Sequence, residues 1–218
     1  MSAQGSGPGP ARAPAPRRAI PLGLLRHGAT DWNRSQRLQG RNDQPLRDDE
    51  AARLRRCALP PVPVFDQLLC SPLRRARETA AALGLDCRVE PALVEMDWGA
   101  WEGQRPAELR AGGDPAFAAA EGRGLDLLPP GGESPRMVQH RLSAWLPGLD
   151  RPTLAVTHKG VIRALLALAH DWPMLGRAPA RLDWQRLHVM LLVDGRLRPW
   201  CYNLPLAGEA PAADARER

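Results

Sequence analysis

The feature that most constrains the fold is the alternation of short apolar runs with helical patterns. The clearest unit runs from Thr153 to Thr157, an apolar run typical of a buried strand, through a tight turn at 158–160 into a helical pattern at 161–169. Strands that alternate with helices are typical of layered α/β proteins whose strands are parallel. The sequence therefore predicts a three-layer α/β/α sandwich with a mostly parallel central sheet.

The same patterns place further elements on both sides of this unit. The predicted strands are 20–25, 65–70 and 87–94, with a hairpin of 187–193 and 197–202 around Asp194-Gly195. The predicted helices are 47–59, 71–83 and 134–146, with short ones near 106–110 and 115–120. We expect Asp48 to cap the first of these helices and Ser134 the third.

The ends of the chain differ in composition from its middle. Residues 1–18 and 207–218 are rich in Gly, Pro, Ala and Arg and show no apolar periodicity. Such segments bury too little apolar surface to offset the entropy of ordering, so we expect two disordered tails. The predicted folded part is one domain over 19–206.

Composition narrows the partners and the compartment. The net charge is +6, but the arginines are interspersed with acids rather than gathered in a run, so nucleic acid is not the expected partner. No apolar stretch reaches the roughly 18 residues of a membrane helix, so no membrane partner is expected either. The four cysteines lack the spacing of a metal site or disulfide framework, which favours reduced thiols. Arg17-Arg18 is followed by an apolar segment too short for an export signal, and we expect a cytoplasmic protein.

Three predicted strands end in polar residues with catalytic potential: His27, Ser71 and His158. The carboxyl ends of parallel strands meet at one edge of a sheet, where α/β proteins bind ligands. In Arg26-His27-Gly28, the glycine permits a sharp turn and the arginine offers a fork of donors beside a potential nucleophile. Taken alone, this tripeptide is better explained as a polar turn at the end of a surface strand.

Two further segments carry charged side chains that suit a phosphate site. Ser71-Pro72 opens a helix whose first turns contain Arg74, Arg75 and Arg77, either an anion site or a solvated basic face. Arg74 and Arg75 lie about 100° apart around the helix, so both cannot serve one site. Glu95 lies in a loop rich in glycine and tryptophan, where burial would raise the pKa of a carboxyl group enough for acid–base catalysis.

Together, these segments resemble the histidine phosphatase superfamily, also called the phosphoglycerate-mutase-like family. The resemblance spans about residues 22–203 and rests on six elements in register. These are Arg26 to Asn33, Gly40 to Leu46, Ser71 to Thr79, Leu93 to Gly103, Pro130 to Ser134 and His158 to Arg163.

The resemblance implies a fold of the phosphoglycerate-mutase type and a role for each matched residue. His27 would be the nucleophile that forms a phosphohistidine, and Glu95 the proton donor that later activates water. Arg75, selected over Arg74 and Arg77, would bind the phosphoryl group together with Arg26, Asn33 and His158, and these cations would keep His27 neutral. Such chemistry implies no metal and no cofactor.

Further substrate contacts are expected at Thr30, Gln39, Gly40 and Lys159. The residue after the second histidine is usually small in this family, and here it is Lys159, the only lysine of the chain. Two interpretations stay open for it: contact with an acidic group of the substrate, or solvation at the turn.

The sequence favours one function and leaves two alternatives. The favoured function is hydrolysis of a small phosphorylated metabolite, because the segment between Gly103 and Ser134 lacks the longer insertions typical of the family's mutases. The first alternative is phosphoryl transfer of the cofactor-dependent phosphoglycerate mutase type, which occurs in the same family. The second is a non-catalytic, basic polyanion-binding protein, which we would expect to have lost one of the residues His27, Arg75, Glu95 and His158. The substrate itself, a ribazole phosphate or a sugar phosphate for example, stays open.

Overall fold

The structure is a computed structural model that describes residues 19–208. The predicted tail at 1–18 and most of the predicted tail at 207–218 lie outside the described residues. Ala207 lies within them, and its backbone exchanges hydrogen bonds with that of Ala58.

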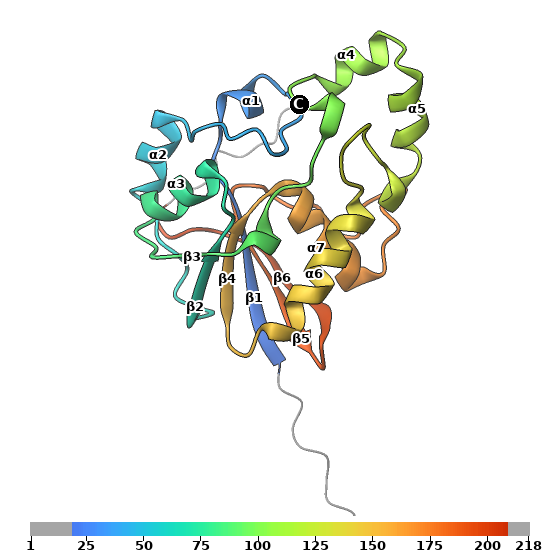
Figure 1. Cartoon of the computed structure of the whole chain (residues 1–218). Helices are drawn as coiled ribbons and strands as arrows, with labels where there is room; N and C mark the ends of the chain where they lie inside the picture. Colours follow the sequence, from blue (N-terminus) through green and yellow to red (C-terminus); the bar gives the residue numbers. More distant parts are fainter. Residues whose placement is uncertain (1–18, 209–218) are drawn as a thin grey trace, which may run out of the picture.

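The centre of the molecule is a six-stranded sheet in the order β3-β2-β4-β1-β5-β6 (Figure 1). The neighbours from β3 to β1 are parallel, whereas β5 is antiparallel to both β1 and β6. Its strands are β1 (Ala19–Arg26), β2 (Gln67–Cys70), β3 (Arg88–Val89), β4 (Thr153–Thr157), β5 (Leu187–Val193) and β6 (Arg196–Leu204). The sheet is thus mixed but mostly parallel, and the predicted fold class is confirmed.

Helices cover both faces of the sheet. The α-helices are α1 (Asp31–Arg34), α2 (Asp48–Leu54), α3 (Arg74–Ala82), α4 (Pro106–Ala111), α5 (Pro115–Glu121), α6 (Pro135–Trp145) and α7 (Lys159–His170). Short 3₁₀ helices are η1 (Pro91–Leu93), η2 (Gly99–Trp101), η3 (Gly124–Asp126) and η4 (Leu146–Gly148).

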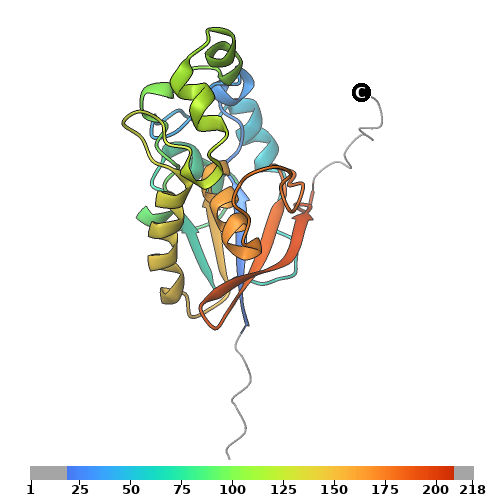
Figure 2. The same cartoon turned by 90° about the vertical axis from the view of Figure 1, so that its right-hand side faces the viewer.

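Alternation along the strands builds two cores, one on each face. In β1, Leu24 packs in the cluster that contains the buried residues of α6 and α7, whereas Leu25 packs in the cluster of α2 and α3. Every residue of β4 is buried, as the continuous apolar run predicts for a strand covered on both faces. Figure 2 shows α6 (yellow) along the sheet and α4 and α5 (green) beyond its upper edge.

The helix predicted at 47–59 is shorter and is capped differently. It spans Asp48–Leu54; Arg47 is the N-cap residue and no side chain caps it, so the expectation that Asp48 caps this helix is wrong. Asp48 is instead the first helical residue, where a negative charge is favoured by the helix dipole. The helix ends early because the chain turns away so that Ala58 can pair with Ala207.

Three other boundaries were predicted too generously. The strand expected at 87–94 is reduced to Arg88–Val89, because Pro91 begins η1 and the Glu90 side chain caps that turn. The strand at 65–70 begins at Gln67, and the helix at 71–83 spans Arg74–Ala82. No tight turn separates β4 from α7, since His158 is itself the N-cap residue and Lys159 the first helical residue.

Other predicted elements agree with the structure. The hairpin turns at Asp194 and Gly195, whose φ angles of 50° and 73° suit a tight left-handed turn. Ser134 caps α6 by accepting a hydrogen bond from the Met137 amide. Helices long and apolar enough to cross a membrane do not occur between residues 19 and 208.

Candidate active site

The carboxyl ends of β1, β2 and β4 meet at the upper edge of the sheet in Figure 1, with α1 and α4 beyond it. The residue after each strand is His27, Ser71 or His158. Backbone bonds fix this edge, since the His27 amide donates to the Thr157 carbonyl at 2.8 Å and the Ser71 amide to the Val156 carbonyl at 2.9 Å. The rings of His27 and His158 consequently lie 5.1 Å apart between centroids.

His27 is oriented and tuned as a nucleophile would need. Its Nδ1 lies 2.7 Å from the Gly28 carbonyl oxygen, which can only accept, so Nδ1 carries the hydrogen and Nε2 keeps its lone pair. Burial, followed by the charges of Arg26 and Arg75, holds the pKa of His27 well below its ordinary value. His158 contributes no charge to this shift, contrary to our expectation, because its own pKa is lowered by burial and by Arg75.

A buried threonine joins the loop that follows His27 to helix α3. The Gly28 amide donates to Thr79 Oγ1 at 2.9 Å, and that hydroxyl donates to the Arg75 carbonyl at 2.7 Å. Thr79 is fully buried, so water cannot replace either bond. This hydroxyl therefore helps to fix the loop, together with the bond from the Arg47 amide to the Ala29 carbonyl at 3.1 Å.

We expect Thr79→Val to lower the free energy of unfolding by about 1–3 kcal/mol, because the buried Gly28 amide would lose its acceptor. Urea unfolding followed by circular dichroism measures this change. Thr79→Ser, which keeps the hydroxyl, is the matched control and should lose less. Equal losses in the two variants would show that the methyl group, and not the hydrogen bonds, provides the stability.

Arg75 is fully buried and bonds to backbone oxygens. Its Nη1 donates to the Asn42 carbonyl at 2.9 Å and its Nη2 to the Gly40 carbonyl at 2.7 Å. Carbonyl groups orient a guanidinium without neutralising it, and the charge of Arg75 acts to lower the pKa of His27. Arg74 is exposed and pairs with Glu78, as expected for a surface residue.

His158 forms a hydrogen bond with Ser71, the residue that follows β2. Its Nε2 lies 2.7 Å from Ser71 Oγ, and that oxygen accepts from the Leu73 amide at 3.3 Å. Ser71 is therefore free to donate its own hydrogen to His158 Nε2. This bond corresponds to the His158 tautomer in which Nδ1 carries the hydrogen. Ser71 thus orients His158, a role that the sequence analysis did not assign to it.

Thr30, Asn33 and Gln39 form one hydrogen-bonded group at the start of α1. Thr30 and Asn33 make a reciprocal capping box. Gln39 Oε1 accepts from Thr30 Oγ1 at 2.9 Å and from Asn33 Nδ2 at 3.1 Å. Both bonds use the amide oxygen, so the orientation of the Gln39 side chain is fixed and its NH₂ group faces away from them.

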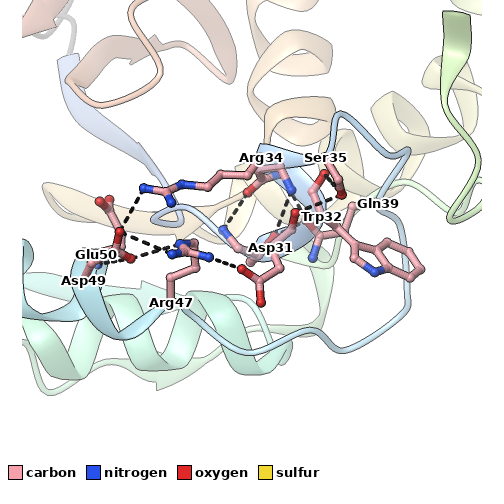
Figure 3. Close-up of polar contacts among 10 residues, drawn as sticks. Asp31, Trp32, Arg34, Ser35, Gln39, Arg47, Asp49 and Glu50 are labelled. Atoms are coloured by element: carbon pink, nitrogen blue, oxygen red, sulfur yellow. Dashed lines mark hydrogen bonds and ion pairs between the residues drawn. The ribbon is translucent and has the colours of Figure 1, made fainter.

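An ion-pair network on the outer side holds α1 against α2 (Figure 3). Arg47 pairs with Asp31 at the start of α1 and with Asp49 in α2, and Arg34 pairs with Asp49 at 2.9 Å. These groups are largely exposed, so each pair adds little stability, but the network links the helix that carries Asn33 to the body of the domain.

Glu95 is 4% exposed and accepts hydrogen bonds on both carboxyl oxygens. Oε1 accepts from the Met96 amide at 2.8 Å and Oε2 from the Gly160 amide at 3.1 Å. Burial raises the pKa of Glu95, and these bonds together with Arg75 and Arg26 oppose the rise only in part. A carboxyl group with a raised pKa can hold a proton under conditions where an ordinary one is ionised.

Two arginines that the sequence did not single out clamp the backbone around Glu95. Arg41 Nε donates to the Glu95 carbonyl at 2.9 Å, and Arg141 Nη2 donates to the Val94 carbonyl at 2.6 Å. Both arginines also pair with Glu133. Such a clamp fixes the direction of the carboxyl group, and only the tertiary structure reveals it.

Trp184 is a third residue that the sequence analysis missed. Its ring lies beside two cations, with Arg26 Cζ at 5.9 Å and Lys159 Nζ at 5.2 Å from the ring centroid. It belongs to the irregular segment between α7 and β5, where no local pattern marks it. Contact with a tryptophan face orients a cation and leaves its charge in place.

Four buried nitrogen atoms around His27 lack a hydrogen-bond partner among residues 19–208. These unpaired donors are Arg26 Nε, Gln39 Nε2, Arg75 Nε and His158 Nδ1. Two further atoms of this kind, Arg141 Nε and His188 Nε2, lie elsewhere. Buried donors are nearly always bonded, so four of them near the His27 ring suit a ligand rich in acceptor oxygens.

A cavity of about 600 Å³ opens at this site. Arg26, His27, Asn33, Gln39, Glu95 and Lys159, all predicted site residues, line it. Arg75 and His158 lie beneath its floor, whereas Thr30 and Gly40 support Gln39 and Arg75 rather than face the cavity. Within the described part of the chain, His, Cys, Asp and Glu side chains form no group of three that could hold a metal ion.

The fold and the site together define a class: an α/β sandwich whose sheet edge brings two histidines, buried arginines and a carboxyl group of raised pKa to one anion-binding cavity. Residues 22–199 match the histidine phosphatase superfamily (branch 1). The chain belongs to this superfamily.

Relatives of known name agree with this membership. The chain is 34% identical over 195 residues to glucosyl-3-phosphoglycerate phosphatase of Mycobacterium tuberculosis, covering 78% of this chain and 86% of that protein. It is 31% identical over 157 residues to adenosylcobalamin/alpha-ribazole phosphatase of Salmonella typhimurium, covering 67% and 77%. The crystal structure of a mycobacterial glucosyl-3-phosphoglycerate phosphatase superposes with a TM-score of 0.69 at 28% identity, covering 86% of this chain and all of that one.

Proposed function

We propose that the protein is a phosphomonoester hydrolase that acts on a small phosphorylated metabolite through a phosphohistidine at His27. The observation that carries this proposal is the set of unpaired donors around His27. A phosphoryl group has three oxygens and two negative charges, so it can satisfy these donors and balance Arg26 and Arg75 at once. Arg75 and His158 are fully buried and do not line the cavity, so their contact with the phosphoryl group is part of this proposal.

In the first step, His27 Nε2 uses its lone pair to attack phosphorus, and the bond from phosphorus to the ester oxygen breaks. Glu95 donates its proton to that oxygen, so the product leaves as a neutral alcohol. Arg26, Arg75 and His158 stabilise the charge that spreads over the three phosphoryl oxygens. Gln39 and Asn33 add neutral donors.

In the second step, a water molecule attacks the phosphohistidine and the N–P bond breaks. Glu95, now ionised, accepts the proton from that water, and inorganic phosphate leaves. His27 recovers its lone pair and Glu95 its proton, so the site returns to its initial state. The arginines already supply the positive charge that a metal provides in other phosphatases, and the proposed reaction is therefore independent of metal ions.

The relatives include both phosphatases and a mutase. Two matches at 31–34% identity are named as glucosyl-3-phosphoglycerate phosphatase and adenosylcobalamin/alpha-ribazole phosphatase, and a third, 31% identical over 162 residues, is named as a 2,3-bisphosphoglycerate-dependent phosphoglycerate mutase of Methylorubrum populi. The choice of hydrolysis rests on the segment that follows Gly103. The segment between Gly103 and Ser134 contains only short helices in this chain. We therefore include the substrates of both named phosphatases among those to be screened.

The test of the proposal is hydrolysis of para-nitrophenyl phosphate by the purified full chain, with and without a chelator. We expect turnover at a rate that EDTA leaves unchanged, because arginines and histidines carry the charge stabilisation. Absorbance of released nitrophenolate measures the rate. Absence of turnover across pH 4–9 would overturn the hydrolase proposal, whereas turnover that EDTA abolishes would overturn only its independence of metal.

A further inference from the structure

Beyond the phosphoryl site, the cavity is lined by three cations that the proposed mechanism does not use. Arg37 donates to the Gly103 carbonyl, and the other two are Lys159 and Arg163. These two lie four residues apart on α7 and therefore share one side of the helix. Each faces a tryptophan ring: Lys159 Nζ lies 5.2 Å from the centroid of Trp184, and Arg163 Cζ lies 5.1 Å from that of Trp172. Both tryptophans belong to the segment that follows α7.

This arrangement is unfavourable for the isolated protein. Like charges four residues apart repel one another on a helix, and a lysine in the first turn opposes the helix dipole. Within the described chain, neither side chain has a carboxylate within 4 Å. Lys159 is exposed at the cavity, and partial desolvation with the neighbouring charges of Arg26 and Arg163 lowers its pKa, whereas Glu95 opposes that shift. A chain with many surface ion pairs has thus left these two cations without an anionic partner.

The remaining charges of the cavity do not supply that partner. Its two carboxyl groups are Glu95, which is bonded to backbone amides, and Glu121, which is paired with Arg110. Apolar side chains, including those of Met96, Trp98, Leu127 and Met174, form much of the rest of the wall. The space is large compared with a phosphate ion, so most of it is available to the alcohol part of a substrate.

We propose that Lys159 and Arg163 form a second anion subsite, and that the substrate is a phosphomonoester that carries another acidic group on its alcohol part. The tryptophan faces position the two cations without neutralising them, which a carboxylate partner would do. This inference rests on the proposed function for the first anion, the phosphoryl group, and it assigns Lys159 to the substrate rather than to solvent.

The test uses pairs of compounds that differ in one acidic group. 3-Phosphoglycerate and glycerol 3-phosphate differ only in a carboxylate, and fructose 1,6-bisphosphate and fructose 6-phosphate in a second phosphate. Each competes with para-nitrophenyl phosphate whether or not it is itself hydrolysed, so the ratio of inhibition constants within a pair isolates the extra group. We expect the wild type to prefer the acidic member of at least one pair by about tenfold, as is typical of a charge-assisted contact.

Lys159→Met and Arg163→Met should each reduce this preference to about threefold or less, and the double variant should abolish it. The matched control is Arg198→Met, which removes one positive charge from an exposed position on β6 and should keep the wild-type ratio. A ratio near one for wild type in both pairs, or an equal fall in the Arg198 variant, would overturn the subsite. The pair that shows the preference identifies the second group as carboxylate or phosphate.

Calorimetric binding of the same pairs to His27→Ala measures the preference without catalysis. A tenfold preference there, combined with no turnover by wild type, would support the subsite and contradict the hydrolase proposal. Turnover by wild type with equal binding of both members of each pair would do the reverse. The two proposals can therefore fail separately.

Discussion

His27→Ala is expected to lower kcat/KM for para-nitrophenyl phosphate by about 10⁴-fold or more, because the variant lacks the atom that accepts the phosphoryl group. No other described histidine can replace it: His158 Nε2 is engaged by Ser71, and His188 is buried in β5. The matched control is His140→Ala, which alters an exposed histidine of α6 and should retain wild-type activity.

The covalent intermediate offers a second measurement of the same prediction. Enzyme quenched in alkali during turnover of a ³²P-labelled substrate should carry label that is lost in acid, the behaviour of a phosphohistidine. His140→Ala should carry this label and His27→Ala should not. Label that persists in the His27 variant, or activity equal to that of wild type, would remove His27 from the role of nucleophile.

Glu95→Gln is expected to lower kcat/KM for an alkyl phosphate such as glycerol 3-phosphate by about 10²–10³-fold, and that for para-nitrophenyl phosphate much less. The parameter is kcat/KM because it excludes the later hydrolysis of the phosphohistidine, in which Glu95 acts as a base for both substrates. The difference follows from the leaving groups, since an alkoxide needs a proton and nitrophenolate does not. Glutamine keeps the acceptor oxygen of the side chain but has no proton of comparable acidity to donate. Steady-state kinetics on the two substrates measures the difference.

The pH dependence of the same variant tests the proton in another way. Attack requires neutral His27, so kcat/KM rises with pH through the pKa of His27. Because this pKa is lowered, the rising limb of the profile lies at more acidic pH than it would for an ordinary histidine. Proton donation requires protonated Glu95, so activity on alkyl phosphates falls as the pH rises through the pKa of Glu95. Because this pKa is raised, the range of activity extends to higher pH. Glu95→Gln should remove the alkaline limb and keep the acidic one.

Glu108→Gln, an exposed change on α4, serves as the control and should keep both limbs. Equal rate losses on the two substrates in Glu95→Gln would assign Glu95 to positioning rather than to proton transfer. An alkaline limb that survives the substitution would point to another group, of which Lys159 is the first to examine because its pKa is lowered by partial desolvation.

The parts of the site that lie at strand ends could be predicted from the sequence, for a geometrical reason. A buried strand is visible as an apolar run, and parallel strands deliver the residues that follow them to one edge. His27, Ser71 and His158 were placed by this argument. Arg75 needed the family resemblance, since the helical pattern alone separates it from Arg74 without choosing between them.

The parts that could not be predicted depend on contacts between distant segments. Arg141 donates a hydrogen bond to the Val94 carbonyl, 47 positions away in the sequence. The sequence of α6 alone does not predict that contact. Trp184 lies in an irregular segment and faces Arg26 only because that segment folds back toward the end of β1. The early end of α2 has the same origin, since pairing of Ala58 with Ala207 overrides local helix propensity.

The position of β4 in the sheet has a consequence for how the protein acquires its activity. The strand lies between β1 and β2, and the other neighbour of β1 is β5. During synthesis, β1 therefore emerges more than a hundred residues before either strand that can pair with it. Contacts so distant in sequence form slowly, and until they form an apolar strand lacks its partners. Pairing of β4 with β1 is also the event that brings His158 to His27, so the proposed site forms only once this late strand is in place.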